Sequence, residues 1–247
     1  MTKVRIAALY DIHGNLPALE AVLQDLERKS VDLLVIGGDV LPGPFASECL
    51  DLLLKAPYKM KFILGNCEEE YVRQMEGSYL SPLPDTVFEQ FEWVRNTLNP
   101  FQELVLSEWP ATLEIDTGTV GKILFCHGTP RASNEIFTPD SDPAFLEAIF
   151  SEVAADVIVC GHTHFQFDIQ VSGKQVVNAG SVGMAASNPG AYWLWIDEKP
   201  ELMHTSFDYA AAAARVRETN FPDAGGFAKN AILEPPSIDS IRKKYTQ

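Results

Sequence analysis

The sequence predicts a single α/β domain, residues 1–247, whose central strands are buried and mostly parallel. Its composition is globular, because 46% of the 247 residues are apolar and 21% are charged, which is enough to bury a sizeable core. Short apolar runs rich in Val, Ile and Leu end at Gly, as strands buried on both faces do. Amphipathic segments alternate with the first of these runs, and no repeat or low-complexity linker divides the chain.

Strands and helices alternate over the first quarter of the chain. The expected strands are Val4–Tyr10, Leu33–Ile36 and Met60–Leu64. Between them, residues 17–28 and 47–54 carry apolar side chains at helical spacing, and Pro17 suits a first helical turn. This order predicts parallel strands joined by right-handed crossovers.

The remaining chain is expected to hold helices and further strands. The stretch 68–108 reads as helical, with helices at 68–75 and 86–98, and we expect it to form a small cap over the sheet edge. Four more strands are expected at 122–126, 156–160, 175–177 and 191–196. The last alternates in polarity, which suits an outer or antiparallel position. A helix at 209–218 precedes a tail, 219–247, that Pro and Gly interrupt up to about residue 240.

The net charge restricts the partners. Lys and Arg total 19 against 34 Asp and Glu, a formal charge of −15, which repels phosphate backbones, so a nucleic-acid polymer is not an expected partner. No apolar run reaches the ~18 residues that a membrane span needs. The four cysteines (Cys49, Cys67, Cys126 and Cys160) show no paired spacing. A reducing cytoplasm is therefore the expected compartment.

Polar residues gather directly after the expected strands. Four of the five histidines are among them, and only His204 lies elsewhere. The set is Asp11, His13, Asp39, Asn66, His127, His162 and His164. Ligands bind at the carboxyl ends of strands in open α/β sheets. Seven nitrogen and oxygen donors are too many for one open metal site but suit two sites that share a ligand. Such donors suit Mn²⁺, Fe, Ni²⁺ or Zn²⁺. We expect His162 and His164 to face one centre from the same side of an extended segment.

The motifs behind this set resemble a known family. In chain order they are Asp11-Ile12-His13, Gly38-Asp39, Gly65-Asn66-Cys67-Glu68, His127-Gly128 and Gly161-His162-Thr163-His164. Together they resemble the calcineurin-like metallophosphoesterases over residues 4 to about 196. The resemblance implies a four-layer αββα sandwich, in which two mixed β-sheets are flanked by helices. It also implies a two-metal centre on one rim.

The resemblance assigns roles to the residues. One metal would take Asp11, His13, Asp39 and His164. The second would take Asp39, Asn66, His127 and His162, with Asp39 bridging. Asp39, Asn66, Cys67 and His127 are the expected catalytic residues. Two metals can clamp a phosphoryl group and lower the pKa of a bridging water towards ~7, and the resulting hydroxide attacks phosphorus in line. Two divalent ions, Mn²⁺ first among them, are thus the expected cofactors.

Cys67 departs from much of the family, in which a histidine follows the Gly-Asn pair. This substitution resembles the small bacterial and archaeal phosphodiesterase branch. It implies hydrolysis of phosphodiester bonds in small or nucleotide-like substrates. A thiol with a pKa near ~8.5 suits proton donation less well than imidazole, so Cys67 is expected to influence the choice between diester and monoester, unless it only lines the site. Asn15 and Arg131 are predicted phosphate contacts, the latter through a bidentate guanidinium.

Other functions stay open at this point. A phosphomonoesterase, including a protein or dinucleoside-polyphosphate phosphatase, would use the same centre. A non-catalytic scaffold that binds proteins would be expected to lose ligands, and all seven are present. Storage or sensing of metal is a further alternative, and a homo-oligomer is compatible with the sequence. Singly, Asp11 and Asp39 could be helix N-caps, His127 a core histidine, Asn66 a turn residue and Arg131 a solvated loop residue.

Overall fold

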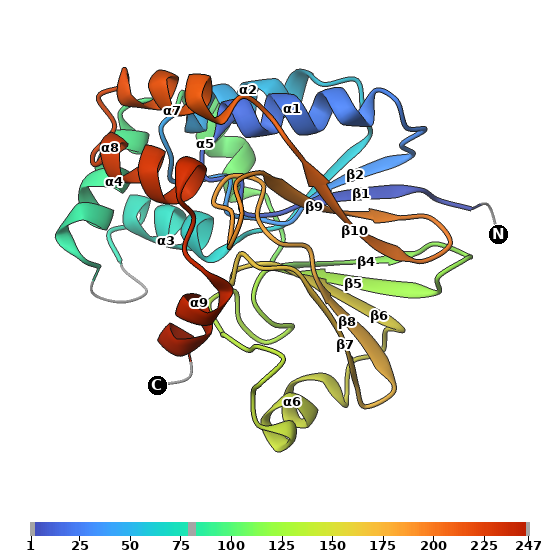
Figure 1. Ribbon diagram of the computed structural model, residues 1–247. Helices are drawn as coiled ribbons and strands as arrows, with labels where there is room; N and C mark the ends of the chain where they lie inside the picture. The colour runs from blue at the N-terminus through green and yellow to red at the C-terminus, as the bar shows by residue number, and fades with distance from the viewer. Residues whose placement is uncertain (1–2, 79–82, 246–247) are drawn as a thin grey trace.

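Two mixed β-sheets packed face to face form the centre of the computed structural model, which describes residues 3–78 and 83–245 (Figure 1). Helices cover the outer face of each sheet. The predicted four-layer αββα sandwich is therefore confirmed. Parts of the expected cap (79–82) and tail (246–247) lie outside the described residues.

The first sheet has the strand order β10-β9-β1-β2-β3. Strands β1 (Ile6–Leu9), β2 (Leu33–Ile36) and β3 (Met60–Phe62) are parallel, as the alternating pattern predicts. β9 (Ala191–Ile196) pairs antiparallel with β1 and with β10 (Pro200–Thr205). The expected antiparallel direction of β9 is confirmed, but β9 lies inside the sheet because β10 occupies the edge.

The second sheet has the order β4-β5-β6-β8-β7. Its three inner strands are parallel: β5 (Lys122–Cys126), β6 (Val157–Cys160) and β8 (Lys174–Asn178). Its edges are the antiparallel strands β4 (Thr112–Asp116) and β7 (Phe167–Val171). The sequence did not predict these two edges or β10.

The helices divide between the two outer faces and the strand ends. α1 (Leu16–Leu26) and α2 (Ala46–Lys55) pack on the first sheet, and α5 (Pro100–Ser107) packs against α2. α6 (Pro143–Phe150) and α9 (Ile238–Tyr245) pack on the second sheet. The others are α3 (Asn66–Met75), α4 (Asp85–Arg95), α7 (Tyr209–Arg217), α8 (Ala224–Phe227) and a π-helix at Ala228–Leu233. In the described part of the chain, no helix combines the length and apolarity that a membrane span requires.

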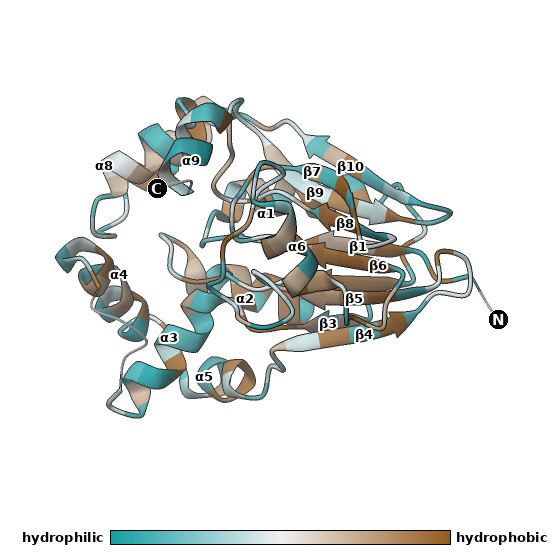
Figure 2. Cartoon of the chain, turned by 90° about the horizontal axis from the view of Figure 1, so that it is seen from below, coloured by the Kyte–Doolittle hydropathy of each residue, from teal (hydrophilic) through white to brown (hydrophobic). Residues whose placement is uncertain are grey.

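The core lies in three layers that run through the sandwich. Inward-facing residues of both sheets, including Ile6, Val35, Phe125 and Val159, pack between the sheets. A second layer joins the first sheet to α1 and α2, and a third joins the second sheet to α6. Apolar colour is accordingly concentrated in the strands in Figure 2. The two sheets are thus held as one body, which fixes their strand ends relative to each other.

The helical stretch after β3 contacts the tail of the chain. Trp93 of α4 packs edge-on against Phe221, with ring centroids 5.3 Å apart. Gln90 Nε2 donates a hydrogen bond to the carbonyl of Pro222 at 3.2 Å. These contacts join segments far apart in sequence above the carboxyl ends of the strands.

Candidate metal centre

The predicted metal ligands all lie at one end of the two sheets. Asp11 and His13 follow β1, and Asp39 follows β2. Asn66 begins α3 after β3, His127 follows β5, and His162 and His164 follow β6. Asp11, His13, Asp39 and His127 are buried, with exposed fractions of 0 to 6%. Each sheet therefore contributes part of one buried polar cluster.

Five of these residues have left-handed backbone conformations. The φ angles are 53° at Asp11, 44° at His13, 54° at Asp39, and 65° at both His162 and His164. Such angles cost on the order of 1–3 kcal/mol per residue and persist where the surrounding structure imposes them. The predicted extended segment at 162–164 is therefore wrong. The two histidines instead reach the cluster through tight left-handed turns.

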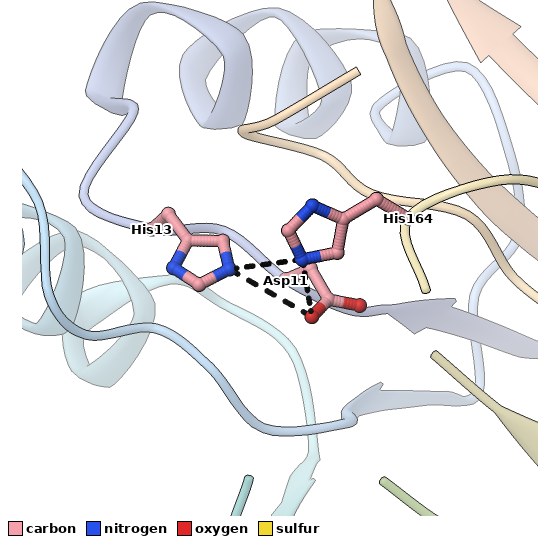
Figure 3. A group of neighbouring side chains, drawn as sticks. All are labelled: Asp11, His13 and His164. Carbon is pink, nitrogen blue, oxygen red and sulfur yellow. Dashed lines mark hydrogen bonds and ion pairs between the residues drawn. The ribbon is translucent and has the colours of Figure 1, made fainter. Parts of the chain in front are cut away.

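One group of ligand atoms comprises Asp11, His13 and His164 (Figure 3). His164 Nε2 lies 3.2 Å from Asp11 Oδ1 and 3.2 Å from His13 Nε2. His13 Nε2 lies 3.8 Å from Asp11 Oδ1. The three side chains converge on one point from β1 and β6, as Figure 3 shows.

A second group comprises Asp39, His127 and His162. His127 Nε2 lies 3.3 Å from Asp39 Oδ2. The same Asp39 oxygen lies 3.8 Å from His13 Nε2 in the first group. The Asp39 carboxylate is therefore close to ligand atoms of both groups, and its bridging role stays a prediction.

Four polar atoms of the cluster are buried without a hydrogen-bond partner among the described residues: Asp11 Oδ1, Asn66 Oδ1, His127 Nε2 and His162 Nε2. A buried polar atom without a partner costs about 1–3 kcal/mol. Divalent cations would satisfy all four, and mixed nitrogen and oxygen donors suit Mn²⁺, Fe, Ni²⁺ or Zn²⁺. The residues present fit the metals that the resemblance implies.

The low pKa of two histidines and the orientation of a third suit metal binding. Burial lowers the pKa of His13 and His162 to about 4, so both rings are neutral at pH 7. His127 Nδ1 lies 2.8 Å from the carbonyl oxygen of Gly37, which assigns one ring proton to Nδ1 and leaves Nε2 as the ligand atom. Burial acts to lower the pKa of His127, but the Asp39 and Asp11 carboxylates raise it to about 10, so a metal ion bound at Nε2 would replace a proton there.

Backbone N–H groups hold the two carboxylates in place. Asp39 Oδ1 accepts from the N–H of Cys67 at 2.9 Å, at the N-terminus of α3. Asp11 Oδ2 accepts from the N–H of His162 at 2.9 Å. Burial alone would raise the pKa of both carboxyls, but the charges of His127 and His164 hold the pKa of Asp39 and of Asp11 below the usual range. Both groups are therefore ionised in this setting.

Glu68 is a positioning residue that the sequence reasoning named only as part of a motif. Its buried carboxylate accepts hydrogen bonds from the N–H groups of Asp39 (2.7 Å), Gly65 (2.9 Å) and Leu41 (3.0 Å). Burial and the charge of Asp39 raise its pKa to about 7. Because it lies three residues after the helix N-cap, the capping pattern at Gly65 could have identified it. It ties the loop after β2 to the start of α3.

Glycine is required where these loops touch. A Cβ on Gly65 would lie 2.1 Å from Asp39 Oδ1, and one on Gly38 would lie 2.3 Å from the Gly65 nitrogen. Gly38 also has φ +89°, which disfavours other residues. The Gly-Asp and Gly-Asn pairs are thus a consequence of two backbones that pass in direct contact.

Of the three other predicted site residues, Cys67 lines the cleft, whereas Asn15 and Arg131 do not. Cys67 lines the cleft, and its Sγ lies 3.1 Å from Asp39 Oδ2. Asn15 is the buried N-cap of α1: it accepts from the N–H of Ala18 and donates to the carbonyl of Gly183. Arg131 is paired with Glu135 and lines a different cavity. The structure therefore does not bring Asn15 or Arg131 into contact with the cleft.

Hydrogen bonds from Asn178 and Ser181 stabilise the loops that carry His162 and Asp11. Asn178 Nδ2 donates to the carbonyl of Gly161 at 2.5 Å and to Thr163 Oγ1 at 3.1 Å. Ser181 Oγ donates to the carbonyl of Asp11 at 2.8 Å. Asn178 is the last residue of β8 and Ser181 follows that strand. The two side chains hold the Asp11 and His162 loops together, and neither lines the cleft.

The cluster forms the floor of a cleft of about 380 Å³. His13, Asp39, Asn66, His162 and His164 line its floor. Its far wall comes from α4, from α8 and the π-helix, and from Tyr245. Five of the seven predicted ligand residues thus border the cleft, whereas Asp11 and His127 are buried and do not line it.

A sequence model of the calcineurin-like phosphoesterase superfamily domain matches residues 4–199. Among curated proteins, phosphodiesterase YfcE of Escherichia coli K12 is 29% identical over 202 residues, 78% of this chain and 86% of that protein. An uncharacterised protein of Methanocaldococcus jannaschii is 24% identical over 246 residues, 90% of this chain and 96% of that protein.

Solved structures share the fold. A hypothetical protein of Pyrococcus horikoshii superposes with a TM-score of 0.78 at 20% identity, covering 95% of this chain and 100% of that one. A metallophosphoesterase of Sphaerobacter thermophilus superposes with a TM-score of 0.71 at 22% identity, covering 92% and 98%.

Proposed function

The chain belongs to the calcineurin-like phosphoesterase superfamily, and from this premise we propose that it is a dinuclear, metal-dependent phosphodiesterase of small or nucleotide-like phosphate esters. Family membership and a phosphodiesterase relative support a hydrolase. The observation that carries the two-metal proposal is the set of adjoining ligand groups: Asp39 belongs to the group with His127 and His162, and its Oδ2 also lies 3.8 Å from His13 Nε2 of the other group. Four buried donor atoms in this cluster lack partners among the described residues.

The chain's own residues hold and orient the reacting groups. Asp11, His13, Asp39 and His164 would hold one ion, and Asp39, Asn66, His127 and His162 the other. Bound divalent ions supply a nucleophile at neutral pH and neutralise charge that develops on the phosphoryl oxygens. The Gly37 carbonyl orients His127, and the N-terminus of α3 fixes Asp39. Cys67 contacts Asp39 and lines the cleft, so we assign it to the choice between diester and monoester.

The substrate follows from the site's position at the base of a small cleft. A single phosphate ester fits about 380 Å³, whereas a polymer would meet a chain with a net charge of −15. We further propose Mn²⁺ as the first metal to test and a reducing cytoplasm as the compartment. All four cysteines are free, and three of them are buried.

The test begins with metal-stripped protein refilled with Mn²⁺, Ni²⁺, Zn²⁺ or Mg²⁺. Hydrolysis of a chromogenic diester and its matching monoester is measured together with the metal content per chain. We expect two ions per chain and diester turnover that depends on them. Asp39→Asn should lose both the bound metal and the diester turnover. Asp116→Asn should keep both, because Asp116 is exposed at the end of β4 and pairs with Lys122 at the start of β5, away from the strand ends that carry the ligands. Monoester preference would indicate a phosphatase, and folded protein without metal or turnover would contradict the proposal.

A further inference from the structure

The wall of the cleft that faces the candidate metal centre carries four large apolar side chains among a few polar ones. Val87 and Phe91 of α4 lie on one side, and Phe221 and Phe227 of the tail on the other. Phe221 packs against both Trp93 and Phe227, with ring centroids 5.3 and 6.1 Å apart. These rings hold α4 and the tail together, so the apolar wall is a packed structure and not a loose edge. A group attached to a phosphate on the floor would meet hydrocarbon.

The lining of this cleft also lacks positive charge. No Lys or Arg of the described chain lines it, and Asp223 is the charged residue on the wall beyond the centre. An uncharged apolar group gains free energy on entering such a space, whereas a second phosphate would be desolvated without a cationic partner. The lining therefore favours substrates whose charge is confined to one phosphate.

A second cavity lies beside the first. It has about 330 Å³ and shares His164, Met184, Asn230 and Tyr245 with the larger cleft. Thr163 and Ser240 add hydroxyl groups, and Pro236 and Ile241 add apolar surface. Again no Lys or Arg among the described residues lines it. Two spaces that meet at His164 match a phosphate with two substituents, whereas a monoester would leave one of them empty.

We propose that the preferred substrates are phosphodiesters with two uncharged organic arms, at least one of them aromatic or bulky and apolar, and with no second phosphate. The apolar arm lies between α4 and the tail, and the other arm enters the cavity beside Tyr245. This inference rests on the proposed function and specifies its substrate class. It excludes dinucleoside polyphosphates and nucleoside triphosphates as preferred substrates.

Equilibrium binding of analogues that cannot be hydrolysed gives a test that does not depend on turnover. Diphenylphosphinate and dimethylphosphinate carry the same single negative charge as a phosphodiester but have no P–O–C bond to break. Isothermal titration of the metal-loaded wild-type protein with each should show diphenylphosphinate binding about tenfold or more tightly than dimethylphosphinate, the scale of a few buried carbon atoms. Equal affinities for the two phosphinates would overturn the proposal.

A pair of variants on α4 then locates the apolar arm. Val87 lines the cleft, whereas its neighbour Phe88 is 39% exposed and does not. Val87→Lys and Phe88→Lys thus add the same charge to the same helix. The readout is the kcat/KM ratio of bis(p-nitrophenyl) phosphate to methyl p-nitrophenyl phosphate. We expect this ratio to fall by about tenfold in Val87→Lys and to stay at the wild-type value in Phe88→Lys.

The outcomes separate the two proposals. Absence of hydrolysis of every diester, with folded and metal-loaded protein, contradicts the proposed function itself. Hydrolysis of both diesters with the same kcat/KM, or an equal ratio in the two variants, contradicts only the substrate class. If Val87→Lys does not fold, the binding series with wild-type protein still decides the question.

Discussion

At the scale of single residues, Glu68 controls the geometry of the centre without facing it. Its carboxylate receives three backbone N–H groups, one of them from Asp39. Glu68→Gln would replace one carboxylate oxygen with an amide NH₂ group, which cannot accept a hydrogen bond from these backbone N–H groups. We expect metal affinity to fall about 10- to 100-fold, as for other groups that orient ligands, and unfolding free energy to fall by about 2 kcal/mol. Chelator competition and urea unfolding measure the two effects.

The matched control is Glu76→Gln, exposed at the C-terminal end of the same helix. It should leave both quantities at the wild-type value. Wild-type metal affinity in Glu68→Gln would show that the two loops keep their positions without this carboxylate.

Cys67 permits a test of specificity at one position. Its thiol lies beside Asp39, and burial and that carboxylate raise its pKa well above the ordinary value. Cys67→His would add a larger side chain with a ring N–H, which can meet the extra charge of a monoester. We expect the diester-to-monoester ratio of kcat/KM to move towards monoesters by about tenfold. Paired chromogenic substrates measure it.

Cys67→Ser is the control for this substitution, because it keeps a small side chain with one hydrogen-bond donor. It should retain the diester preference. Identical profiles for the Cys, Ser and His forms would mean that position 67 only lines the cleft.

The positions of the ligands could be predicted from sequence, but their conformations could not. Asp11, Asp39 and His127 stand directly after apolar runs, and strand ends converge in α/β sheets. The left-handed backbone at His162 and His164 is imposed by neighbouring loops, so local sequence does not reveal it. The sequence suggested Arg131 as a phosphate contact because it does not reveal the ion pair that Arg131 makes with Glu135 in the folded loop.

At the scale of elements, buried strands were predictable and solvent-facing ones were not. β5 and β6 read as continuous apolar runs, whereas β4 and β7 alternate and lie at sheet edges. Short alternating segments give a weaker signal. The start of α5 did carry a signal, because Asn99 caps the helix and Pro100 occupies its first position. The π-helix after α8 depends on packing against α7 and has no comparable signal.

One ion pair joins the residue before β1, Arg5, to the residue before β2, Asp32. Arg5 Nε and Nη2 bind both oxygens of Asp32, at 2.8 and 3.0 Å, and the Arg5 N–H adds a third bond. The hydrogen bonds from Arg5 lower the pKa of Asp32 to about 2. Because the folded-state pKa is depressed, this stabilisation is present above about pH 4 and is lost as the pH falls through about 2.

Asp32→Asn should therefore cost about 0.5–1 kcal/mol at pH 7, a value reduced by the partial exposure of the pair. The difference from wild type should shrink between pH 4 and pH 2. Urea unfolding of both proteins across this range measures it. A difference that does not change with pH would mean that the carboxylate charge is not what stabilises this contact.

At the scale of the whole molecule, the centre exists only when the two sheets are packed together. Asp11, His13, Asp39 and Asn66 come from loops of the first sheet, and His127, His162 and His164 from the second. The layer between the sheets sets the distance between these groups, and Tyr10 Oη donates across it to the carbonyl of Val159 at 3.1 Å. Binding of the proposed metal ions would therefore be coupled to folding of the sandwich.

Metal removal should consequently destabilise the entire domain. Without cations, the cluster retains two buried carboxylates close together, unpartnered donor atoms among the described residues and several left-handed residues. An ion present at 100 times its Kd adds about 2.7 kcal/mol of stability. Two ions would therefore raise Tm by on the order of 10–20 °C for a domain of this size. Calorimetry of metal-loaded and chelator-treated protein measures the shift. Because the gain arises from ligands in both sheets, Asp39→Asn should lose most of it and Asp116→Asn should keep it. A Tm that chelation leaves unchanged would mean that the sandwich holds its strand ends in position without metal, with the charges of His127 and His164 compensating the buried carboxylates.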